Sequence, residues 1–513
     1  MPDPTPAPWY RPPLDRVGLV LGPLLLIGWR VWGDHGALTP EAHRLAGILL
    51  FTIVWWVTEP IPIPATGLFA VALCVILGAV PADEQTRQGT RAVLAPFADP
   101  SVFFLLGGLF IGRAMTRHGL DRRIALALLC TRWAGRSPGT LLAAVGLSVV
   151  LVSMWISNAA ATAMMCPVTV GIITVLAAGR GPGFAESPYA TALLLITAFG
   201  ASVGGIATPI GTATNVVALG YMKRPEVLGR SVDFLSWSAV GVSMMVLIYL
   251  GMYAWLRAQA PAPGLDMAAL RDHLRNEYSR LGKWKMGERN TLVVFLIVVA
   301  LWVSPGVLGL AGFTESQTAF ARCVPEEIAA VLAPVLLFLL PTDYRRREFT
   351  LTPADWQQID WGTLLLFGSA LSLGGLMFRT GLAEVVGRTA FDLAGTRDPW
   401  VLTAVAIAAG ILLSEVTSNT ATVSALLPVV HRLAVEAGVD PLPPLLGLTF
   451  GASFGSALPV STPPNAIVYS TGLAPVRRMV RAGLGVDLIA GVVIWAVLRF
   501  AWEVVGWSPM RGD

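Results

Sequence analysis

Long apolar stretches separated by short polar ones dominate the pattern of this chain. A stretch of about 20 apolar residues is enough to cross the hydrocarbon core of a bilayer as a helix. The candidate spans without a polar interruption are residues 17–33, 44–58, 62–80, 101–118, 234–257, 289–305, 327–341, 360–378 and 482–502. The pattern therefore predicts an all-α polytopic membrane protein.

Four further apolar segments are broken midway by clusters of Ser, Thr, Asn, Gly or Pro. Residues 138–180 and 399–436 are long enough to enter the membrane and return, which predicts two re-entrant hairpins. Residues 187–222 and 443–473 are long enough to cross once with an unwound middle, which predicts two interrupted helices. Together with the uninterrupted spans, these segments predict about 11 transmembrane helices.

Three sequence blocks recur in the same order in both halves of the chain. The block LLGGLFIGRAMTRHGL at 105–120 matches LFGSALSLGGLMFRTGL at 366–382. Residues 153–168 match 414–429, and residues 199–215 match 450–465. The predicted spans bring the first block of each half into the membrane from opposite sides. Inverted repeats with interrupted helices are typical of secondary transporters, whose sites lie at the repeat interface.

The repeat suggests five regions along the chain. Each half is expected to contribute scaffold helices followed by transport elements, with a cytoplasmic linker or short amphipathic helix between the halves. These regions are residues 1–135 (first scaffold helices), 136–257 (first transport elements), 258–288 (linker), 289–398 (second scaffold helices) and 399–513 (second transport elements).

The composition and the placement of charge agree with a membrane protein. Hydrophobic residues make up 55% of the chain and charged ones 13%, with a mean hydropathy of +0.67, whereas soluble domains carry about 25% charged residues. Most Arg and Lys clusters fall on one side of the predicted spans, Lys223-Arg224 being the main exception. The positive-inside rule then predicts a cytoplasmic N-terminus in the cell membrane. No basic stripe interleaved with aromatic residues indicates nucleic acid as a partner.

The tips of the two predicted hairpins, Ser157-Asn158 and Ser418-Asn419, carry the polar groups that a binding site needs. Two short helices that meet at a polar tip leave backbone groups without partners, which is tolerated in a membrane only inside protein or beside water. Free N–H groups at helix N-termini bind anions, and exposed carbonyl and hydroxyl oxygens suit a hard cation such as Na⁺. The broken crossings at 211–215 and 461–465 expose further carbonyl oxygens.

At these residues the chain resembles the divalent anion:sodium symporter family, whose members carry dicarboxylates, citrate or sulfate. The resemblance covers most of the chain and rests on the two Ser-Asn tips, the Thr462–Asn465 loop and the flanking runs at 55–59 and 415–417. It implies a homodimer with a dimerising scaffold and a mobile transport domain. That domain would carry substrate and sodium across the membrane as an elevator.

The resemblance also implies the site residues. The first sodium site would use Ser153, Ser157, Asn158 and the carbonyl of Gly211. The second would use Ser414, Thr417, Asn419 and the carbonyl of Ser461. The substrate would meet Ser157, Asn158, Thr212, Ser418, Asn419, Thr420, Thr462 and Pro463. The chain departs from the family pattern at Ala159, which replaces a Thr, and at Ala213-Thr214, which replaces Pro-Pro. These departures concern the choice of substrate.

The predicted site contains no Arg or Lys, so a bound dianion depends on cations for charge compensation, which predicts sodium coupling. Glu415 beside the second tip leaves open a proton-coupled carrier, because an acid within a membrane span is a functional candidate by default. A cation-independent anion exchanger is a third alternative, and an anion channel is disfavoured by hairpins that pinch the path. The histidines form no cluster in the sequence, which argues against an enzyme.

Overall fold

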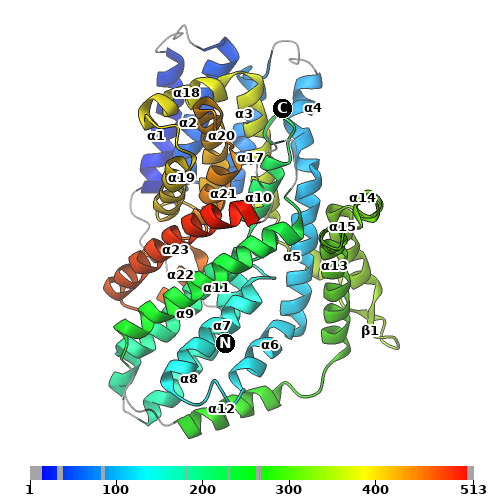
Figure 1. The fold of residues 1–513 in the computed structure, drawn as a ribbon, viewed down its shortest axis with the longest axis vertical. Helices are drawn as coiled ribbons and strands as arrows, with labels where there is room; N and C mark the ends of the chain where they lie inside the picture. The colour runs from blue at the N-terminus through cyan, green and yellow to red at the C-terminus, as the bar shows by residue number, and fades with distance from the viewer. Residues whose placement is uncertain are drawn as a thin grey trace. The chain divides into compact units, whose positions relative to one another are not determined.

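Helices make up nearly the whole of the computed structural model (Figure 1). The structure describes residues 14–31, 38–81, 87–179, 182–228, 232–261, 265 and 267–504. The N-terminal residues predicted to be cytoplasmic and part of the linker predicted at 258–288 lie outside these residues. Within them, the two strands form one small antiparallel hairpin, β1 (Pro341–Asp343) with β2 (Glu348–Phe349).

The chain divides into two compact units. Unit 1 comprises residues 1–99, 361–396 and 424–438. Unit 2 comprises residues 100–360, 397–423 and 439–513. Helix α20 (Asn419–Ala437) begins in unit 2 and ends in unit 1. Both Ser-Asn tips therefore belong to unit 2.

Unit 1 is built from helices at the start of each half of the chain. Its elements are α1 (Leu14–Val31), α2 (Pro40–Thr58), α3 (Ile63–Ile76), α4 (Arg87–Leu94), η2 (Ala95–Ala98), α17 (Trp361–Arg379) and α18 (Leu382–Ala394). Helix α3 packs on α2 and α17, and α1 packs on α2. The Trp55 indole fastens the last pair by donating a hydrogen bond of 2.9 Å to the carbonyl oxygen of Gly18.

Unit 2 holds the remaining elements. In the first half these are α5 (Pro100–His118), α6 (Leu120–Leu129), α7 (Pro138–Ser153), α8 (Asn158–Ala178), η3 (Pro182–Glu186), α9 (Pro188–Gly205), α10 (Ala213–Met222) and α11 (Phe234–Gln259). After them come α12 (Met267–Arg280), α13 (Met286–Leu310), α14 (Thr314–Cys323), α15 (Glu326–Leu339), α16 (Pro353–Trp356), α19 (Pro399–Ser414), α21 (Leu442–Gly451), α22 (Pro463–Ser470) and α23 (Val476–Val504). Figure 1 shows α7, α9 and α11 side by side, and they are in contact.

The helices that lead into the site start at strong local signals. Ser137, Ser187 and Asp398 each precede a proline at the first helical position, of α7, α9 and α19 respectively. Their side chains accept hydrogen bonds from backbone N–H groups of the first turn. A polar cap satisfies a donor that the helix leaves free, and proline has no N–H to lose there.

All four interruptions predicted from the sequence lie between two helices. The first hairpin breaks between α7 and α8 and the second between α19 and α20. The crossings break between α9 and α10 and between α21 and α22. Each half therefore repeats one order: a helix pair with a Ser-Asn tip, a broken crossing, and one long helix, α11 or α23.

Among the described residues, seven helices are long and apolar enough to cross a membrane. They include α8, α11, α13 and α23. The helices α7, α19 and α21 are apolar but shorter, and each is one member of a broken pair. Their lipid-compatible surfaces make the chain a multi-pass membrane protein, as the hydropathy pattern predicts.

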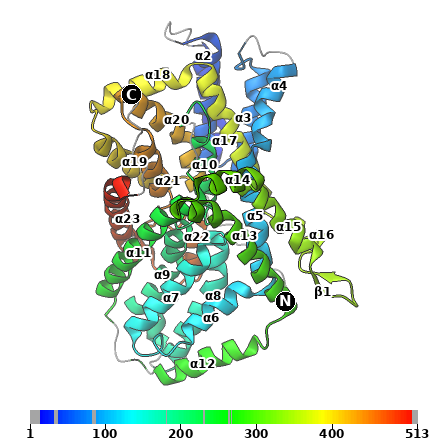
Figure 2. The same cartoon turned by 45° about the vertical axis from the view of Figure 1, so that its right-hand side comes forward.

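Helix α12 is the amphipathic alternative predicted for the region between the halves. It buries Leu270 and Leu274 and contacts α6 and α8, across whose ends it lies in Figure 2. The segment that follows α12 is fastened by Arg123 of α6. This buried guanidinium pairs with Glu288 through bonds of 2.7 and 3.2 Å and also donates to the carbonyl of Gly282. Such a paired buried charge fixes the geometry of the connection.

Candidate functional site

The first tip gathers three oxygen atoms around the end of α7. The buried Ser153 hydroxyl lies 2.9 Å from Oδ1 of Asn158 and 2.8 Å from the carbonyl oxygen of Ala201 on α9. Ser157 caps α8 by accepting a hydrogen bond of 3.3 Å from the Ala160 amide. The predicted residues Ser153 and Asn158 are therefore in direct contact, and Ala201 joins them.

The second tip repeats this arrangement atom for atom. The buried Ser414 hydroxyl lies 2.5 Å from Oδ1 of Asn419 and 2.8 Å from the carbonyl oxygen of Ala452. Ser418 accepts a hydrogen bond of 3.2 Å from the Ala421 amide and so caps α20. The Thr417 hydroxyl lies 2.6 Å from the hydroxyl of Thr422.

Each cluster contains more acceptors than hydrogens. A serine hydroxyl carries one hydrogen, so it can donate to only one of its two neighbouring oxygens. The neighbouring oxygen that receives no hydrogen keeps its lone pairs available in the protein interior. Hydroxyl, amide and carbonyl oxygens are the donor set that a hard cation prefers, and these two clusters fit Na⁺ in that respect.

Two asparagines hold the unwound segments beside these clusters. Asn215 donates from its amide nitrogen to the carbonyls of Gly205 and Thr208, both at 2.9 Å. Asn465 does the same to Gly455 at 3.2 Å and Leu458 at 3.0 Å. Because these segments have left the helix, their carbonyls need a donor from elsewhere. The same clamp therefore closes both broken crossings.

Asn215 also carries a buried acceptor without a partner in the described part of the chain. Its Oδ1 atom makes no hydrogen bond there, although the residue is fully buried. A buried polar atom of this kind costs free energy unless something else pairs with it. The orphaned oxygen is a second feature of the first half that fits a cation.

Glycines let the broken crossings approach the tips closely. A Cβ atom at Gly205 would overlap the side-chain amide of Asn158, and one at Gly211 would lie 2.5 Å from the carbonyl oxygen of Gly205. Gly211 therefore packs directly against Gly205. In the second half a Cβ at Gly455 would lie 2.8 Å from the carbonyl oxygen of Ser414. The Ser461 hydroxyl donates to that same glycine's carbonyl.

Four helices have their N-terminal ends at the two tips and the two broken crossings. Besides Ser157 and Ser418, the caps are Thr212 before α10 and Thr462 before α22. Thr462 accepts a hydrogen bond of 3.4 Å from the Asn465 amide, whereas the Thr212 hydroxyl lies 3.4 Å from the Thr214 hydroxyl instead. Free N–H groups and the helix dipole favour negative charge at such ends. Pro463 is the first residue of α22 and is exposed.

The two halves of unit 2 interlock through the short helices after the breaks. Helix α22 of the second half packs on α8 and α9 of the first, and α10 of the first half packs on α21 of the second. The two tips are therefore connected by packed helices of opposite halves. The hydrogen bonds described between predicted site residues join residues of the same half. Thr420 is the second residue of α20 and is half-buried.

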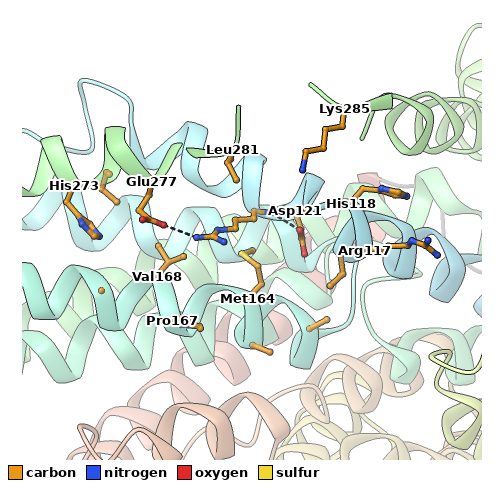
Figure 3. Close-up of a pocket in the computed structure, with 17 residues that line it drawn as sticks. Arg117, His118, Asp121, Met164, Pro167, Val168, His273, Glu277, Leu281 and Lys285 are labelled. Carbon is orange, nitrogen blue, oxygen red and sulfur yellow. Dashed lines mark hydrogen bonds and ion pairs between the residues drawn. The ribbon is translucent and has the colours of Figure 1, made fainter. Parts of the chain in front are cut away.

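A cavity of about 840 Å³ runs along α8, starting two residues after Asn158 (Figure 3). Its walls are one face of α8, the corner between α5 and α6, and α12. Figure 3 shows His273 and Glu277 of α12 opposite Val168 of α8. The lining residues are Thr116–Gly119, Asp121, Arg122, Ala160, Ala163, Met164, Pro167, Val168, Gly171, His273, Leu274, Glu277, Leu281 and Lys285.

Charged side chains of the cavity are mostly paired. Arg122 forms an ion pair of 2.8 Å with Glu277, and Arg117 pairs with Asp355. Burial raises the pKa of the Asp121 carboxyl, because its charged form loses hydration. The backbone N–H of Lys285 donates to Glu288 at 2.7 Å, whereas its ammonium group has no hydrogen bond or ion pair with a described side chain and is available to an anion.

Sequence reasoning missed several groups of this site. The carbonyls of Ala201 and Ala452 complete the oxygen clusters, but a main-chain oxygen leaves no trace in residue type. The clamps Asn215 and Asn465 did leave one, because each closes the third repeated block at the same place. Gly205 was hidden among the many glycines of the same helix.

Three comparisons bear on the identity of the chain. The family model described as "Sodium:sulfate symporter transmembrane region" matches residues 33–508. A sodium-dependent dicarboxylate transporter of Staphylococcus saprophyticus is 32% identical over 494 residues, which cover 94% of this chain and 91% of that protein. Its namesake from Staphylococcus aureus is 29% identical over 502 residues, covering 95% and 91%.

A solved structure shares the fold. The YdaH transporter of Alcanivorax borkumensis superimposes with a TM-score of 0.57 at 16% identity, covering 91% of this chain and 99% of that one. The likeness concerns the architecture alone. From the family model and the curated relatives, this chain belongs to the sodium:sulfate symporter family of membrane transporters.

Proposed function

We propose that this chain imports a divalent anion of the C4-dicarboxylate class together with Na⁺. The observation that carries the proposal is the pair of matched oxygen clusters, Ser153 with Asn158 and Ser414 with Asn419, each beside a capped helix N-terminus. The relatives named as sodium-dependent dicarboxylate transporters support both the cation and the class of anion. Citrate and sulfate are the other anions with which C4-dicarboxylates are to be compared.

The division of labour within the site follows from its charges. The proposed substrate residues are Ser157, Asn158, Thr212, Ser418, Asn419, Thr420, Thr462 and Pro463. None of them is cationic, so the two carboxylates of a substrate would be held by hydroxyls, amides and helix N-termini. Two cargo sodium ions on Ser153, Ser157, Asn158 and Gly211, and on Ser414, Thr417, Asn419 and Ser461, would supply the missing positive charge.

The transport step is proposed to follow the elevator scheme in a homodimer with cytoplasmic N-termini. The two tips, the broken crossings and the long helices α11 and α23 would move with the cargo. Binding of cation and anion together would neutralise the site, and a neutral site crosses a low-dielectric barrier far more readily than a charged one. This condition couples the movement to the presence of both cargoes.

The first experiment tests sodium coupling directly. Purified protein in proteoliposomes is given labelled succinate with external Na⁺ or with choline at the same ionic strength. At an effective dielectric constant of 20, a cation about 4 Å from a carboxylate contributes roughly 4 kcal/mol, so uptake should fall by at least about 100-fold in choline. Unlabelled malate, citrate and sulfate, added as competitors, rank the anions.

Three results would contradict the proposal. Uptake in choline that responds to an inward proton gradient would identify a proton-coupled carrier. Counterflow of labelled against unlabelled succinate at full rate without Na⁺ would identify an exchanger. Conductance without saturation by succinate would point to a channel instead.

The cavity along α8 is proposed to be the cytoplasmic vestibule of the first tip. Its wall includes Ala160 and Ala163, within six residues of Ser157, and the available Lys285 would attract an anion toward it. A cysteine at exposed Ala163 should react with a membrane-impermeant thiol reagent applied from the cytoplasmic side, and succinate with Na⁺ should slow the reaction. Ala161→Cys is the matched control, because Ala161 is fully buried on the same turn. The background replaces Cys130 and Cys323 with serine.

Labelling of Ala163→Cys from the outer side only would refute the vestibule and the predicted cytoplasmic N-terminus together. Labelling from the cytoplasmic side that succinate does not slow would separate the cavity from the substrate path.

A further inference from the structure

Two acids, a half-buried Glu415 and a buried Asp487, distinguish the second half of the site from the first. Glu415 follows Ser414 at the second tip, and Asp487 lies in the middle of α23 with 5% of its surface exposed. Charged groups within a membrane protein are costly unless they are paired. Their surroundings therefore indicate what they do.

Both acids accept hydrogen bonds from the unwound segment after α21. Glu415 accepts from the backbone amides of Ala457 at 2.8 Å and Leu458 at 3.0 Å, one to each carboxylate oxygen. Asp487 accepts from the amide of Ser456 at 3.1 Å. The two carboxyl groups are also close enough to interact electrostatically. Three consecutive backbone donors are thus held by one pair of acids.

The lengths of the helices explain why the second half requires these acceptors. Helix α9 continues to Gly205, whereas α21 ends at Gly451, and the third repeated block is one residue shorter in the second half. The segment 452–462 therefore has more backbone amides outside a helix. Ser456 and Ala457 are buried, so water cannot satisfy them. Each such donor without a partner would cost free energy.

The first half fastens its unwound segment in a different way. The Thr208 hydroxyl donates to the carbonyl of Met154 at 2.5 Å, and Met154 is the repeat counterpart of Glu415. On α11, a Cβ at Gly241 would lie 2.5 Å from the carbonyl oxygen of Ile206.

Helix α23 makes the corresponding close approach, because a Cβ at Gly483 would overlap the backbone of Ser456. Four residues later α11 has Met245 where α23 has Asp487. Methionine thus occupies both positions in the first half that acids occupy in the second.

We propose that Glu415 and Asp487 are positioning residues for the second cation site. They hold residues 456–458 in place, so that the carbonyls of Gly455 and Leu458 meet the clamp Asn465 and the backbone of Gly455 stays against Ser414. The acids do not touch the cargo; they set the geometry of the oxygens that do. This inference rests on the sodium coupling proposed above.

The test measures how Na⁺ acts on variants of the full-length protein. Thermal unfolding of purified protein is followed as Na⁺ is added without substrate, and succinate uptake is measured over the same Na⁺ range. Glu415→Ala and Asp487→Ala should each raise the half-saturating Na⁺ concentration by about tenfold, the factor expected when a charge-assisted bond is lost. The KM for succinate at saturating Na⁺ should stay within about twofold of the wild type, since this bond does not contact the anion.

A conservative variant and a control make the result specific. Asp487→Asn should stay within about threefold of the wild type, because the amide oxygen still accepts from the backbone amide of Ser456. Asp355→Ala is the matched control, since Asp355 is also buried and accepts from a backbone amide, that of Thr352 at 2.8 Å. It should lower the unfolding temperature without changing the Na⁺ dependence.

The outcomes separate this inference from the proposed function. An unchanged half-saturating Na⁺ concentration in both alanine variants, with lower stability alone, would reduce the acids to a structural role and overturn the proposal. Loss of proton-driven uptake in Asp487→Asn, with its Na⁺ response intact, would also overturn it. If the wild type itself shows no Na⁺ response, sodium coupling fails first, and this inference fails with it.

Discussion

Asn465→Ala and Asn215→Ala are expected to lower sodium-driven uptake by at least about 100-fold. Each asparagine donates two hydrogen bonds to carbonyls of an unwound segment, and both residues are buried. Leaving a buried acceptor without a donor costs about 1–3 kcal/mol, and two such losses at the middle of that range correspond to about three factors of ten. The measurement is the initial rate of succinate uptake in proteoliposomes containing equal amounts of protein.

A comparison with Asn290 separates this effect from general instability. The Asn290 amide also donates two buried bonds, to the carbonyl of Pro341 at 3.0 Å and to the Thr350 hydroxyl at 2.9 Å, far along the chain from both tips. Asn290→Ala should lower the unfolding temperature while leaving the Na⁺ dependence of uptake unchanged. Asn465→Asp should fail like Asn465→Ala, because a carboxylate cannot donate to the two carbonyls. Normal uptake by Asn465→Asp would contradict the role of the clamp.

Gly205→Ala is expected to weaken both Na⁺ activation and succinate affinity by about tenfold or more, because its methyl group would occupy the place of the Asn158 amide. Oδ1 of Asn158 belongs to the first oxygen cluster, so its displacement removes a cation ligand and shifts a group that faces the anion. Half-saturating Na⁺ and the KM for succinate are measured in the same uptake assay.

Gly200→Ala is the control for that substitution. Gly200 lies on the same helix, but a Cβ there would meet its nearest atom, the carbonyl oxygen of Gly146, at 3.4 Å, which is close to an ordinary contact. Uptake by Gly200→Ala should therefore stay within about threefold of the wild type. If both variants behave alike, the effect belongs to packing of α7 on α9 and not to the tip.

The asymmetry between the two halves concerns the substrate as well as the cation. The first tip has Ala159 where the second has Thr420, so one hydroxyl is missing on the side of α8. The second half instead carries the acid pair of Glu415 and Asp487 behind its tip. The two halves of the proposed site thus share the same oxygen clusters and asparagine clamps, but they differ in the groups that surround these features.

The sequence predicted the architecture well because its signals are local. Apolar length, helix breakers and caps act within a few residues, so the four interruptions, the Ser-Asn tips and the transporter class could be inferred before any packing was known. Family membership confirms two predictions: the resemblance that the motifs indicated, and a transporter in place of an enzyme. The dimer, the elevator movement and the direction of insertion stay predictions.

The sequence by itself determined which residues form the tips, since Ser and Asn carry their oxygens in their side chains. Only the tertiary structure decided what completes each cluster, because the carbonyls of Ala201 and Ala452 belong to the main chain and any residue would supply them. It also decided the meaning of Glu415. Within the sequence Glu415 is an isolated acid beside a tip. In the structure it accepts hydrogen bonds from the backbone amides of Ala457 and Leu458 and lies near the carboxyl of Asp487. These groups come together because α21 ends early and α23 packs against the unwound segment that follows it.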